Sequence, residues 1–573
     1  MNDPFANEAI AAIAAASELD ESTVRQLLTV PPKEEMGEFA LPCFTLAKQF
    51  RKNPVTIATE LAVAIDVGES FAAVEAVGPY VNFKVDRSRF ASHVLDQVRS
   101  AGSSYGSLDQ GAGKTLVVDF SSPNLAKPFS IAHLRSTAIG NAIYRIHRFL
   151  GWQCVGINHL GDYGANFGQL LAAYQIWGDP EQVAADPVPE LVALYTRFNQ
   201  ELEADPGLQE EARSRLRKLA AGDEEMVSLW RYFIDEGRKE AERVYAILDV
   251  HFDDSTGESH YAEALQEVVG AFDGKGLAVE SEGALIVDLE EWEMAPCMLR
   301  TSNGTSTYHS RDIAALIDRE RKYGFDKMVY VTDVRQSLHF RQVFKAVELL
   351  GVDWVERCHH APFGMLSFKG ANLSTRKGNM VFLEEVLDQA VELTREIIDE
   401  KNPDLEGKEA IARQVGISAV VFADLDSRRT RDVVFEWEEI LNFDGETGPY
   451  LQYTHARFCS ILRRFTQAEG DAAAVIAAAD PGLLTEDAEL RVVRQLEQYP
   501  LRLQQAGDEL EPSYLSTYLI ELATVANKFY NELPVLSGPG AELVAARVAL
   551  VDGVRTVLRS GLDLLGMNAP EAM

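Results

Sequence analysis

Apolar residues recur at two different spacings in the first third of this chain, and each spacing predicts a different element. Between Ile131 and Leu150 they stand three and four positions apart, which places them on one face of a helix. The runs TLVVDF (115–120) and CVGINHL (154–160) flank that helix and are short and rich in β-branched residues, as strands are. Gly151 stands where a glycine commonly ends a helix. The order strand, loop, helix, strand predicts a parallel α/β sheet, whose ligands bind beyond the carboxyl ends of the strands.

The first 110 residues predict a small α+β domain. Helical spacing occurs at Ile10–Ala16, and one amphipathic helix is expected over Ala47–Ile65, around the run KNPVTIATELA. The run AVGPYVNFKV (76–85) alternates apolar and polar residues, which predicts a strand. The Gly- and Ser-rich stretch Ala101–Gly113 has the composition of a linker to the next domain.

The rest of the chain changes from mixed to helical patterns. Long polar helical segments suggest an insertion after the first two strands of the sheet, and the runs GALIVDL (283–289) and KMVYVTD (327–333) predict that the sheet then resumes. From Glu385 onward nearly every segment has helical spacing. The domains expected after residue 110 are therefore a Rossmann-like parallel-sheet domain at 111–385 with an insertion at about 172–250, a helical stem at 386–445, and an all-α domain at 446–573.

Length and composition exclude two classes of protein. A chain of 573 residues is too long for one hydrophobic core, so several domains are expected. We expect neither a membrane span nor a secretory signal, because no run of eighteen apolar residues occurs and the first residues lack a basic segment followed by an apolar one. Five scattered cysteines without a CxxC pair indicate free thiols in a reducing cytoplasm. Cys358-His359-His360 lacks a second ligand cluster, so no structural metal is expected.

The formal net charge of −34 would repel a polyanion at long range. A nucleic-acid partner would therefore require cations that are concentrated locally. Each candidate cluster is more often a solvated helix face than a binding surface. The candidates are Arg213, Arg215, Arg217 and Lys218; Arg428, Arg429 and Arg431; and Arg457, Arg463 and Arg464.

The segment from Asp119 to Ser136 carries more polar side chains than a simple connection needs. It spans the predicted carboxyl end of a strand and the start of a helix, where unpaired N–H groups and the helix dipole favour phosphate. Lys127 and His133 would add cationic or hydrogen-bonding groups there. A single histidine at a helix start is more often structural, so the surrounding motif has to decide.

That motif is long and specific. Three segments resemble the ATP-binding signature of class I arginyl-tRNA synthetases: SSPNLAKPF (121–129), HLRST (133–137) and NHLGDYGANFG (158–168). The resemblance implies ATP contacts from Lys127, Ser130, Ala132 and His133.

The chain departs from the family tetrapeptide His-x-Gly-His, because it has Ser130-Ile131-Ala132-His133. Ser130 is a shorter hydroxyl donor that cannot carry charge, and Ala132 adds one methyl where the family lays adenine against bare backbone. We interpret this as a lineage-specific variant of a working site.

A second constellation lies in TSTYHSRDIAA (305–315), which is predicted to be a strand running into a helix. Tyr308 and Asp312 are four positions apart and would share one face of that helix. A guanidinium needs a carboxylate, preferably beside an aromatic plane. By resemblance, Asp312 holds the guanidinium of arginine and Tyr308 flanks it; the alternative is an ordinary surface helix-cap Asp. The resemblance also assigns to the amino acid Asp119, Ser122, Asn124 and Gln336.

Residues 374–379 (STRKGN) form a cationic loop whose ordinary interpretation is a solvated turn. In the family this is the divergent counterpart of the KMSKS loop, which closes over the ATP phosphates. The resemblance implies that Arg376 and Lys377 supply the charge and act with His133 in catalysis, with Lys369 as a further candidate cation. It also places Ser374 and Thr375 at the nucleotide.

Sequence segments near the C-terminus extend the resemblance. FDGETGPYLQYTHAR (443–457) is similar to the entry into the family's anticodon-binding helical domain, which implies tRNA contacts from Tyr453, Arg457 and Arg463. Aromatic residues at helical spacing otherwise belong to cores more often than to interfaces. The stretch 36–54 is similar to the family's N-terminal additional domain, which touches the outer corner of tRNA.

The resemblance implies ATP-dependent ligation of L-arginine to tRNA(Arg) through an arginyl-adenylate. Mg²⁺ would accompany ATP, tRNA would bind before arginine is activated, and the protein would act as a cytoplasmic monomer. Two alternatives stay open. One is another class I synthetase, such as one for cysteine or glutamine, and the Tyr308/Asp312 pair argues against it. The other is a non-catalytic relative that binds tRNA or arginine, which Ser130 and Ala132 keep open.

Overall fold

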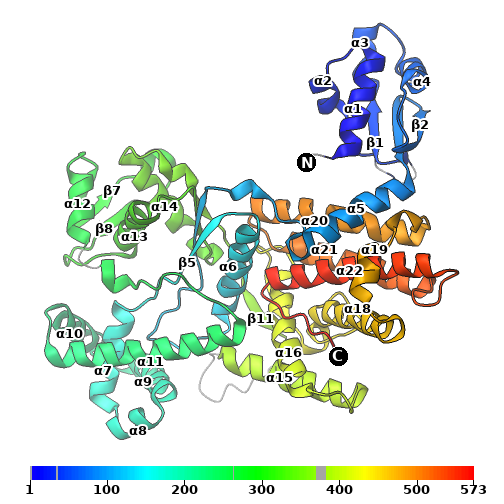
Figure 1. The fold of residues 1–573 in the computed structure, drawn as a ribbon. Coiled ribbons are helices and arrows are strands. Elements are labelled where there is room, and N and C mark those ends of the chain that lie inside the picture. The colour runs from blue at the N-terminus through cyan, green and yellow to red at the C-terminus, as the bar shows by residue number, and fades with distance from the viewer. Residues whose placement is uncertain (1–2, 32, 34–35, 262–263, 370–381) are drawn as a thin grey trace. The chain divides into compact units, whose positions relative to one another are not determined.

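The computed structural model describes the chain except for residues 1–2, 32, 34–35, 262–263 and 370–381 (Figure 1). The chain divides into two compact units, each assembled from separate stretches of sequence. The first unit comprises Met1–Tyr105, Phe458–Gln498 and Thr524–Val557, and the second comprises Gly106–Arg457, Tyr499–Ala523 and Leu558–Met573.

The first unit begins with a small α+β module, as predicted. Its three strands form an antiparallel sheet in the order β1-β3-β2. The strands are β1 (Phe39–Pro42), β2 (Phe71–Val77) and β3 (Tyr80–Val85), and the helices are α1 (Pro4–Ser17), α2 (Glu21–Leu27), α3 (Ala47–Phe50), α4 (Pro54–Ala64) and α5 (Arg87–Ala101).

Two predictions for this module were wrong in detail. The helix expected over Ala47–Ile65 is two helices, because Arg51 adopts a left-handed φ of 54° and the Asn53 side chain caps α4 by accepting from the Val55 N–H. The strand expected over residues 76–85 is the end of β2, the turn and the whole of β3 in a hairpin, since Gly78 takes a φ of 57° between the two strands. In both places a residue with positive φ interrupts a regular pattern.

The C-terminal part of the chain is helical, which confirms the predicted all-α domain. Within the first unit a buried ion pair joins Arg547 Nε to Glu489 Oε1 at 2.7 Å. The helices are α18 (Gly448–Glu469), α19 (Ala472–Ala478), α20 (Asp487–Asp508), α21 (Ser513–Glu532) and α22 (Ala541–Leu564).

The second unit is built on a four-stranded, wholly parallel sheet in the order β10-β9-β4-β5. Helix α6 (Ala132–Phe149) connects β4 to β5 and ends before Gly151, whose φ is 90°. This confirms the predicted parallel α/β fold. The strands are β4 (Thr115–Asp119), β5 (Gln153–Ile157), β9 (Lys327–Tyr330) and β10 (Cys358–His360).

The run GALIVDL does not rejoin that sheet, contrary to prediction. It forms β7 (Ala284–Val287), which pairs antiparallel with β6 (Ala278–Ser281) and β8 (Cys297–Arg300) in a sheet of its own. The turn between β6 and β7 places Glu282 and Gly283 at φ of 51° and 80°, so the chain reverses at once onto its neighbour. The strand expected to lead into α13 is reduced to one bridge between Arg300 and Ser306.

Five helices fill the predicted insertion, and they pack around a hydrophobic core that also includes Leu125, Ala126 and Leu160 from the loops after β4 and β5. Further helices follow the sheet strands. Among the described residues, one strand interrupts the stretch expected to be helical: β12 (Val433–Phe435), which pairs in parallel with β11 (Leu366–Phe368) of the preceding domain. The helices of the second unit after α6 are α7 (Ala165–Trp177), α8 (Pro180–Ala185), α9 (Pro187–Ala204), α10 (Leu208–Ala220), α11 (Glu224–Leu248), α12 (Leu265–Asp273), α13 (Tyr308–Tyr323), α14 (Ser337–Leu349), α15 (Leu383–Lys401), α16 (Lys408–Leu425) and α17 (Trp437–Ile440).

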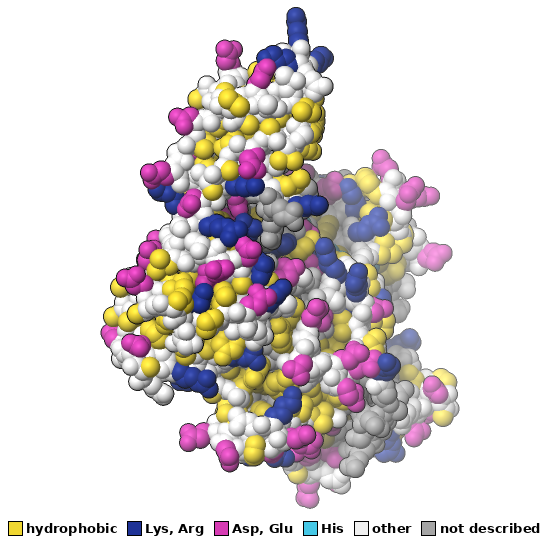
Figure 2. Space-filling model, turned by 90° about the vertical axis from the view of Figure 1, so that its right-hand side faces the viewer, with side chains coloured by type: hydrophobic (Ala, Val, Ile, Leu, Met, Phe, Trp, Pro, Cys, Tyr) yellow, Lys and Arg dark blue, Asp and Glu magenta, His cyan; other side chains and the backbone are white. Residues whose placement is uncertain are grey.

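The cation cluster on α10 is balanced within its own helix. Arg215 pairs with Glu211 at 2.7 Å, and Arg217 pairs with Glu210 at 2.6 Å. In the face shown in Figure 2, Lys and Arg side chains likewise lie among Asp and Glu side chains. The α10 cluster therefore fits a solvated helix face better than a polyanion-binding surface. Among the described helices, none has the length and apolar content that crossing a membrane requires.

A buried ion pair connects the sheet domain to the helices that follow it. Arg135 on α6 is 1% exposed; its Nε donates to Asp424 Oδ1 on α16 at 2.6 Å, and its Nη1 donates to the Arg431 carbonyl at 2.7 Å. Burial raises the pKa of Asp424 to about 6, although Arg135 opposes that shift. Asp424 therefore depends on Arg135 for its charged form.

We predict that Arg135→Met destabilises the fold by about 3–5 kcal/mol at pH 8, because it leaves a buried carboxylate unpaired. The loss should shrink as the pH falls from 8 toward 6, because removing Arg135 raises the pKa of Asp424 further and the protonated carboxyl needs no cation. Urea denaturation at pH 8 and pH 5 measures both effects. The double variant Arg135→Met/Asp424→Leu should recover most of the stability, and a single variant as stable as the unaltered chain at pH 8 would contradict the prediction.

Candidate active site

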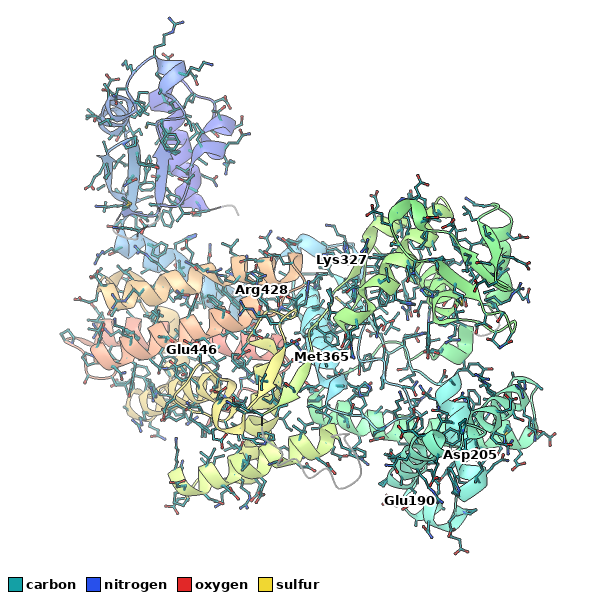
Figure 3. The ribbon with its side chains drawn as sticks, turned by 180° about the vertical axis from the view of Figure 1, so that it is seen from behind. Glu190, Asp205, Lys327, Met365, Arg428 and Glu446 are labelled. Atoms are coloured by element: carbon teal, nitrogen blue, oxygen red, sulfur yellow. The ribbon has the colours of Figure 1, made fainter. Side chains whose placement is uncertain are left out.

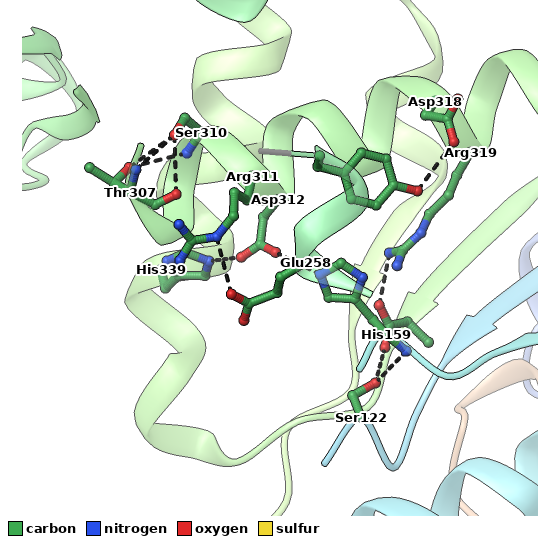
Figure 4. Close-up of polar contacts among 12 residues, drawn as sticks. Ser122, His159, Glu258, Thr307, Ser310, Arg311, Asp312, Asp318, Arg319 and His339 are labelled. Carbon is green, nitrogen blue, oxygen red and sulfur yellow. Dashed lines mark hydrogen bonds and ion pairs between the residues drawn. The ribbon is translucent and has the colours of Figure 1, made fainter. Parts of the chain in front are cut away.

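Polar side chains gather at the carboxyl edge of the parallel sheet, where β4, β5 and β9 end (Figure 4). The loop after β4 carries Ser121 and Ser122 at positive φ of 65° and 47°, which residues other than glycine rarely adopt. Such strained backbone is concentrated at functional sites. The edge therefore has the position and the strain expected of a ligand-binding loop.

Asp119 ends β4 and is buried. Its Oδ2 pairs with Arg319 Nη1 of α13 at 2.8 Å, and its Oδ1 accepts from Ser122 Oγ at 2.7 Å. Ser122 Oγ in turn accepts from the His159 N–H at 3.1 Å. Asp119 thus already has a cation within the protein, and a substrate ammonium would share this carboxylate with Arg319.

His133 lies in the first turn of α6, as predicted, and its protonation is set by its surroundings. His133 Nδ1 lies 3.0 Å from the Ser130 N–H, which can only donate, and 3.2 Å from the Ser130 carbonyl; because the shorter contact requires Nδ1 to accept, we assign the proton of the neutral ring to Nε2. Burial lowers the pKa of His133 to about 4, and Lys127 contributes to that shift. At neutral pH His133 is therefore a hydrogen-bond donor and not a cation.

The other residues predicted at the nucleotide surround this turn. Lys127 is exposed, with its Nζ 5.9 Å from the centre of the Tyr195 ring. Ala132 is exposed at the first position of α6, and Ser130 forms a bridge with Phe382 just before α15. The predicted residues of the cationic loop lie outside the described residues; they are Ser374, Thr375, Arg376 and Lys377.

Asp312 on α13 stands at the centre of a histidine-lined group. His339 Nε2 on α14 lies 2.5 Å from Asp312 Oδ2, and His159 Nε2 after β5 lies 3.9 Å from Asp312 Oδ1. Burial disfavours the charge of Asp312, but the hydrogen bond from His339 and the charges of His339, His159 and Arg319 hold its pKa below the usual range. Asp312 is therefore an ionised carboxylate with about a quarter of its side chain exposed, which fits a cation holder better than a helix cap.

A second carboxylate lies close to Asp312. Glu258 Oε2 pairs with Arg311 Nε at 3.1 Å, and burial raises the pKa of Glu258 to about 7, with Arg311 opposing and Asp312 adding to the shift. The Arg311 guanidinium also lies over the Tyr308 ring, 4.8 Å from its centre. The chain's own guanidinium thus shows how a carboxylate and a phenol ring hold such a group here.

Tyr308 begins α13, as the shared-face prediction requires, but its ring contacts Arg311 and is 59% exposed. Gln336 is exposed and immediately precedes α14. Asn124 Oδ1 accepts from the Ala126 N–H at 3.1 Å, and Asn124 forms a bridge with Gly161. Within the described part of the chain, no hydrogen bond brings Gln336 or Asn124 to Asp312.

The residues predicted to touch tRNA lie on α18. The guanidinium of Arg457 lies 4.8 Å from the centre of the Tyr453 ring, and 38% of Tyr453 is exposed. Arg463 is exposed further along the helix. A phenol ring and nearby guanidinium groups on one helix are suited to base stacking and phosphate contacts.

Four functional candidates were missed by reasoning from the sequence: His159, Glu258, Arg319 and His339. His159 lies within the motif NHLGDYGANFG, and His339 follows the predicted Gln336 by three positions, but nothing in their spacing points to Asp312. His159 has the stronger structural signal, since both its ring nitrogens are buried without a hydrogen bond in the described structure. Glu258 begins a short 3₁₀ helix (Glu258–Tyr261) before α12, in a stretch that has no recognisable motif.

All five cysteines carry free thiols. Among the described residues, no group of three or more His, Cys, Asp and Glu side chains is arranged to hold a metal ion.

Three family models match consecutive parts of the chain. Residues 95–437 match "tRNA synthetases class I (R), catalytic domain", and residues 451–573 match the "DALR anticodon binding domain". Residues 5–85 match the "Arginyl tRNA synthetase N terminal domain". The catalytic match includes every residue of the carboxyl-edge group described above.

Relatives match over nearly the whole chain. An arginine–tRNA ligase of Alkaliphilus metalliredigens is 46% identical, with 96% of each chain covered, and one of Clostridium botulinum is 45% identical, with 97% of this chain and 98% of the relative covered. The solved Thermus thermophilus arginyl-tRNA synthetase superposes with a TM-score of 0.78 at 27% identity over 99% of both chains. The family match, the near-complete relatives and the shared fold confirm the resemblance first seen in the motifs: this chain belongs to the arginyl-tRNA synthetases, a class I family of aminoacyl-tRNA synthetases.

Proposed function

We infer that the chain ligates L-arginine to tRNA(Arg) with ATP. In the first step a carboxylate oxygen of arginine attacks the α-phosphorus of ATP, and pyrophosphate leaves as the arginyl-adenylate forms. In the second step a 3′-terminal ribose hydroxyl of tRNA attacks the arginyl carbonyl carbon, and AMP leaves. The observation that carries this inference is the pair of carboxylates, Asp312 and Glu258, beside Tyr308 and next to the strained loop after β4.

We propose that Asp312 and Glu258 together hold the substrate guanidinium. Asp312 is ionised and partly exposed; its Oδ2 is held by the hydrogen bond with His339, while His159 Nε2 lies 3.9 Å from its Oδ1. Glu258 has a raised pKa, so a bound cation would favour its charged form. Tyr308 would flank the planar group, as it flanks Arg311 in this structure.

For the other end of the amino acid we propose the loop after β4. Asp119 and Asn124 would bind the α-ammonium and α-carboxylate region, with Ser122 beside them and Gln336 approaching from the start of α14. The Asp119 carboxylate is held in place by Arg319. A fixed carboxylate offers an ammonium a partner without a cost of reorganisation.

Catalysis would consist of positioning the reactants and stabilising charge on the α-phosphate, because neither step needs a nucleophile from the enzyme. We propose that neutral His133 donates from Nε2 and that Lys127, Ser130 and Ala132 line the nucleotide. Arg376 and Lys377, with Ser374 and Thr375, would complete the phosphate contacts; Mg²⁺ enters as part of the ATP substrate.

We further propose that Tyr453, Arg457 and Arg463 contact tRNA(Arg), that tRNA binds before arginine is activated, and that the protein acts as a monomer in the cytoplasm, where free thiols persist. One observation favours a second candidate, a relative that binds tRNA or arginine without catalysis: Ser130 stands where the family signature has its first histidine. Arginine-dependent ATP–pyrophosphate exchange in the presence of tRNA, run with all twenty amino acids, separates the two. Exchange with arginine alone supports the ligase, and exchange with none supports the binding protein.

We predict that Asp312→Asn lowers kcat/KM for arginine about 10²- to 10³-fold in that exchange assay, because a neutral amide cannot offset a buried guanidinium, at a cost of about 3–5 kcal/mol. The KM for ATP should stay within about twofold. Asp318→Asn is the matched control, since Asp318 lies on the same helix and bonds Tyr261 at 3.2 Å. Near-normal arginine kinetics in Asp312→Asn would show that another carboxylate holds the guanidinium.

The raised pKa of Glu258 predicts a pH-dependent affinity for arginine. Ionised Glu258 binds the guanidinium and protonated Glu258 does not, so the KM for arginine should rise about tenfold between pH 8 and pH 6. Glu258→Gln should abolish that dependence and raise the KM at pH 8. The control Glu267→Gln removes an exposed partner of Arg321 and should leave the profile unchanged. A profile that survives in Glu258→Gln belongs to a different group.

The lowered pKa of His133 predicts that this residue does not titrate during catalysis at neutral pH. His133→Ala should reduce kcat of adenylate formation about 10²-fold, since it removes one donor to the phosphate. His133→Gln keeps an N–H donor and should retain more activity than His133→Ala. If kcat of the unaltered chain fell as the pH rose through about 6.5, and His133→Gln abolished that pH dependence, His133 would instead act as a cation.

A further inference from the structure

A cavity of about 280 Å³ lies at the opposite end of the parallel sheet from the active site. Lys114 directly precedes β4, Trp152 directly precedes β5, and Lys327 is the first residue of β9. Because these strands are adjacent and parallel, all three residues lie at their amino ends, while Asp119 lies at the carboxyl end of β4. Lys327 is labelled in Figure 3, close to the sheet.

The cavity combines two cations with one aromatic ring. Lys114 Nζ and Lys327 Nζ lie 5.3 Å and 5.2 Å from the centre of the Trp152 ring. The two ammonium groups repel each other, and burial together with that repulsion lowers the pKa of Lys327. The carboxylate of Asp508, which lines the cavity, offsets part of the repulsion. The neighbouring Asp326 carboxylate accepts from the Thr115 N–H at 2.8 Å, so it is already used in the chain.

Further donors line the same cavity without partners in the described structure. Among the described residues, none forms a hydrogen bond or ion pair with the ammonium groups of Lys114 and Lys327, the side-chain amides of Gln110 and Gln504, or the indole N–H of Trp152. A lysine whose alkyl chain packs on an indole can leave its ammonium group in solvent, which would account for one unpartnered donor. It does not explain several donors of different kinds that surround one cavity.

The walls of the cavity are specifically shaped. A Cβ at Gly111 would lie 2.2 Å from Trp152 Cδ1, so only a glycine leaves room for the indole. His147 is buried beside the indole, with ring centres 5.8 Å apart, and its Nδ1 donates to the Ile143 carbonyl at 2.8 Å. The ring is therefore held in one orientation, and its Nε2 is left as an acceptor. The indole and imidazole form a fixed wall against which a ligand can pack.

We propose that this cavity binds a small phosphate-bearing ligand, with the phosphate group between Lys114 and Lys327. Two ammonium groups, two amides and an indole N–H together offer more donors than the two oxygens of a carboxylate can accept, whereas a phosphate has three terminal oxygens and up to two charges. A protonated phosphate oxygen can also donate to His147 Nε2. The phosphate either is free or belongs to a small organic molecule such as a nucleotide.

The test is a titration of the full-length protein with inorganic phosphate at constant ionic strength. The signal is the fluorescence of Trp152, taken as the difference between the unaltered chain and Trp152→Phe. The expected result is a saturable change whose dissociation constant rises about tenfold in Lys114→Gln or Lys327→Gln and about 100-fold in the double variant. No saturable change up to about 50 mM phosphate, or equal binding by the double variant, would overturn the proposal.

Lys345→Gln is the matched control, because Lys345 lies 5.2 Å from the Trp292 ring centre but is neutralised by Glu348. It should leave phosphate binding unchanged, and a loss of binding there would contradict the assignment of the site. A parallel titration with uridine 5′-monophosphate distinguishes the sources. Tighter binding than phosphate identifies a nucleotide-like ligand, and equal or weaker binding identifies free phosphate; either supports the site. If unfractionated tRNA displaces phosphate from the site, the cavity binds RNA and the small-ligand proposal fails.

Intact folding of the lysine variants is checked independently by arginine-dependent pyrophosphate exchange. Neither lysine belongs to the proposed catalytic group, so exchange should remain within about twofold. A double variant that keeps this activity but loses phosphate binding isolates the effect to the cavity. A double variant that keeps both contradicts the proposal, even if the proposed ligase function holds.

Discussion

The buried ion pair between Asp119 and Arg319 is the constraint on which the active site depends. It joins the end of β4 to helix α13, and both side chains are at most 7% exposed. The loop after β4 carries the residues proposed for the nucleotide, while α13 carries Asp312, so one interaction fixes the two halves of the site relative to each other. The Arg319 guanidinium also lies 5.4 Å from the centre of the ring of Tyr330, the last residue of β9, so the carboxyl end of β9 takes part in the same contact. Breaking such a pair would leave a buried charge, so the arrangement is rigid.

The parts of this fold that local patterns encode could be predicted. The strand β4, the helix α6 and the stop at Gly151 follow from apolar spacing and one glycine within 40 residues. The partner of GALIVDL could not be predicted, because pairing in a sheet is decided by which strand is nearest in space, and a tight turn brings β6 to it first. The break in Ala47–Ile65 was missed although Asn53 followed by Pro54 is a typical helix start; the left-handed Arg51 before them has no sequence signature of its own.

The site divides in the same way. Motif resemblance supplied Asp312, Tyr308 and His133, because each of them lies within a short sequence motif. It could not supply His339, which reaches Asp312 from 27 positions away, because that contact exists only once α13 and α14 pack together. Nor could it supply the protonation states: the neutrality of His133 and the raised pKa of Glu258 come from burial, which the sequence does not display.

The central claim is that Asp312 and Glu258 jointly hold a guanidinium at the carboxyl edge of the sheet. The most direct measurement is a crystal structure of the protein with L-arginine and a non-hydrolysable ATP analogue. The account predicts guanidinium nitrogens within about 3.2 Å of oxygens from both carboxylates. It also predicts the arginine carboxylate next to the analogue's α-phosphate. An arginine whose guanidinium lies elsewhere, or an empty pocket at saturating arginine, would contradict it.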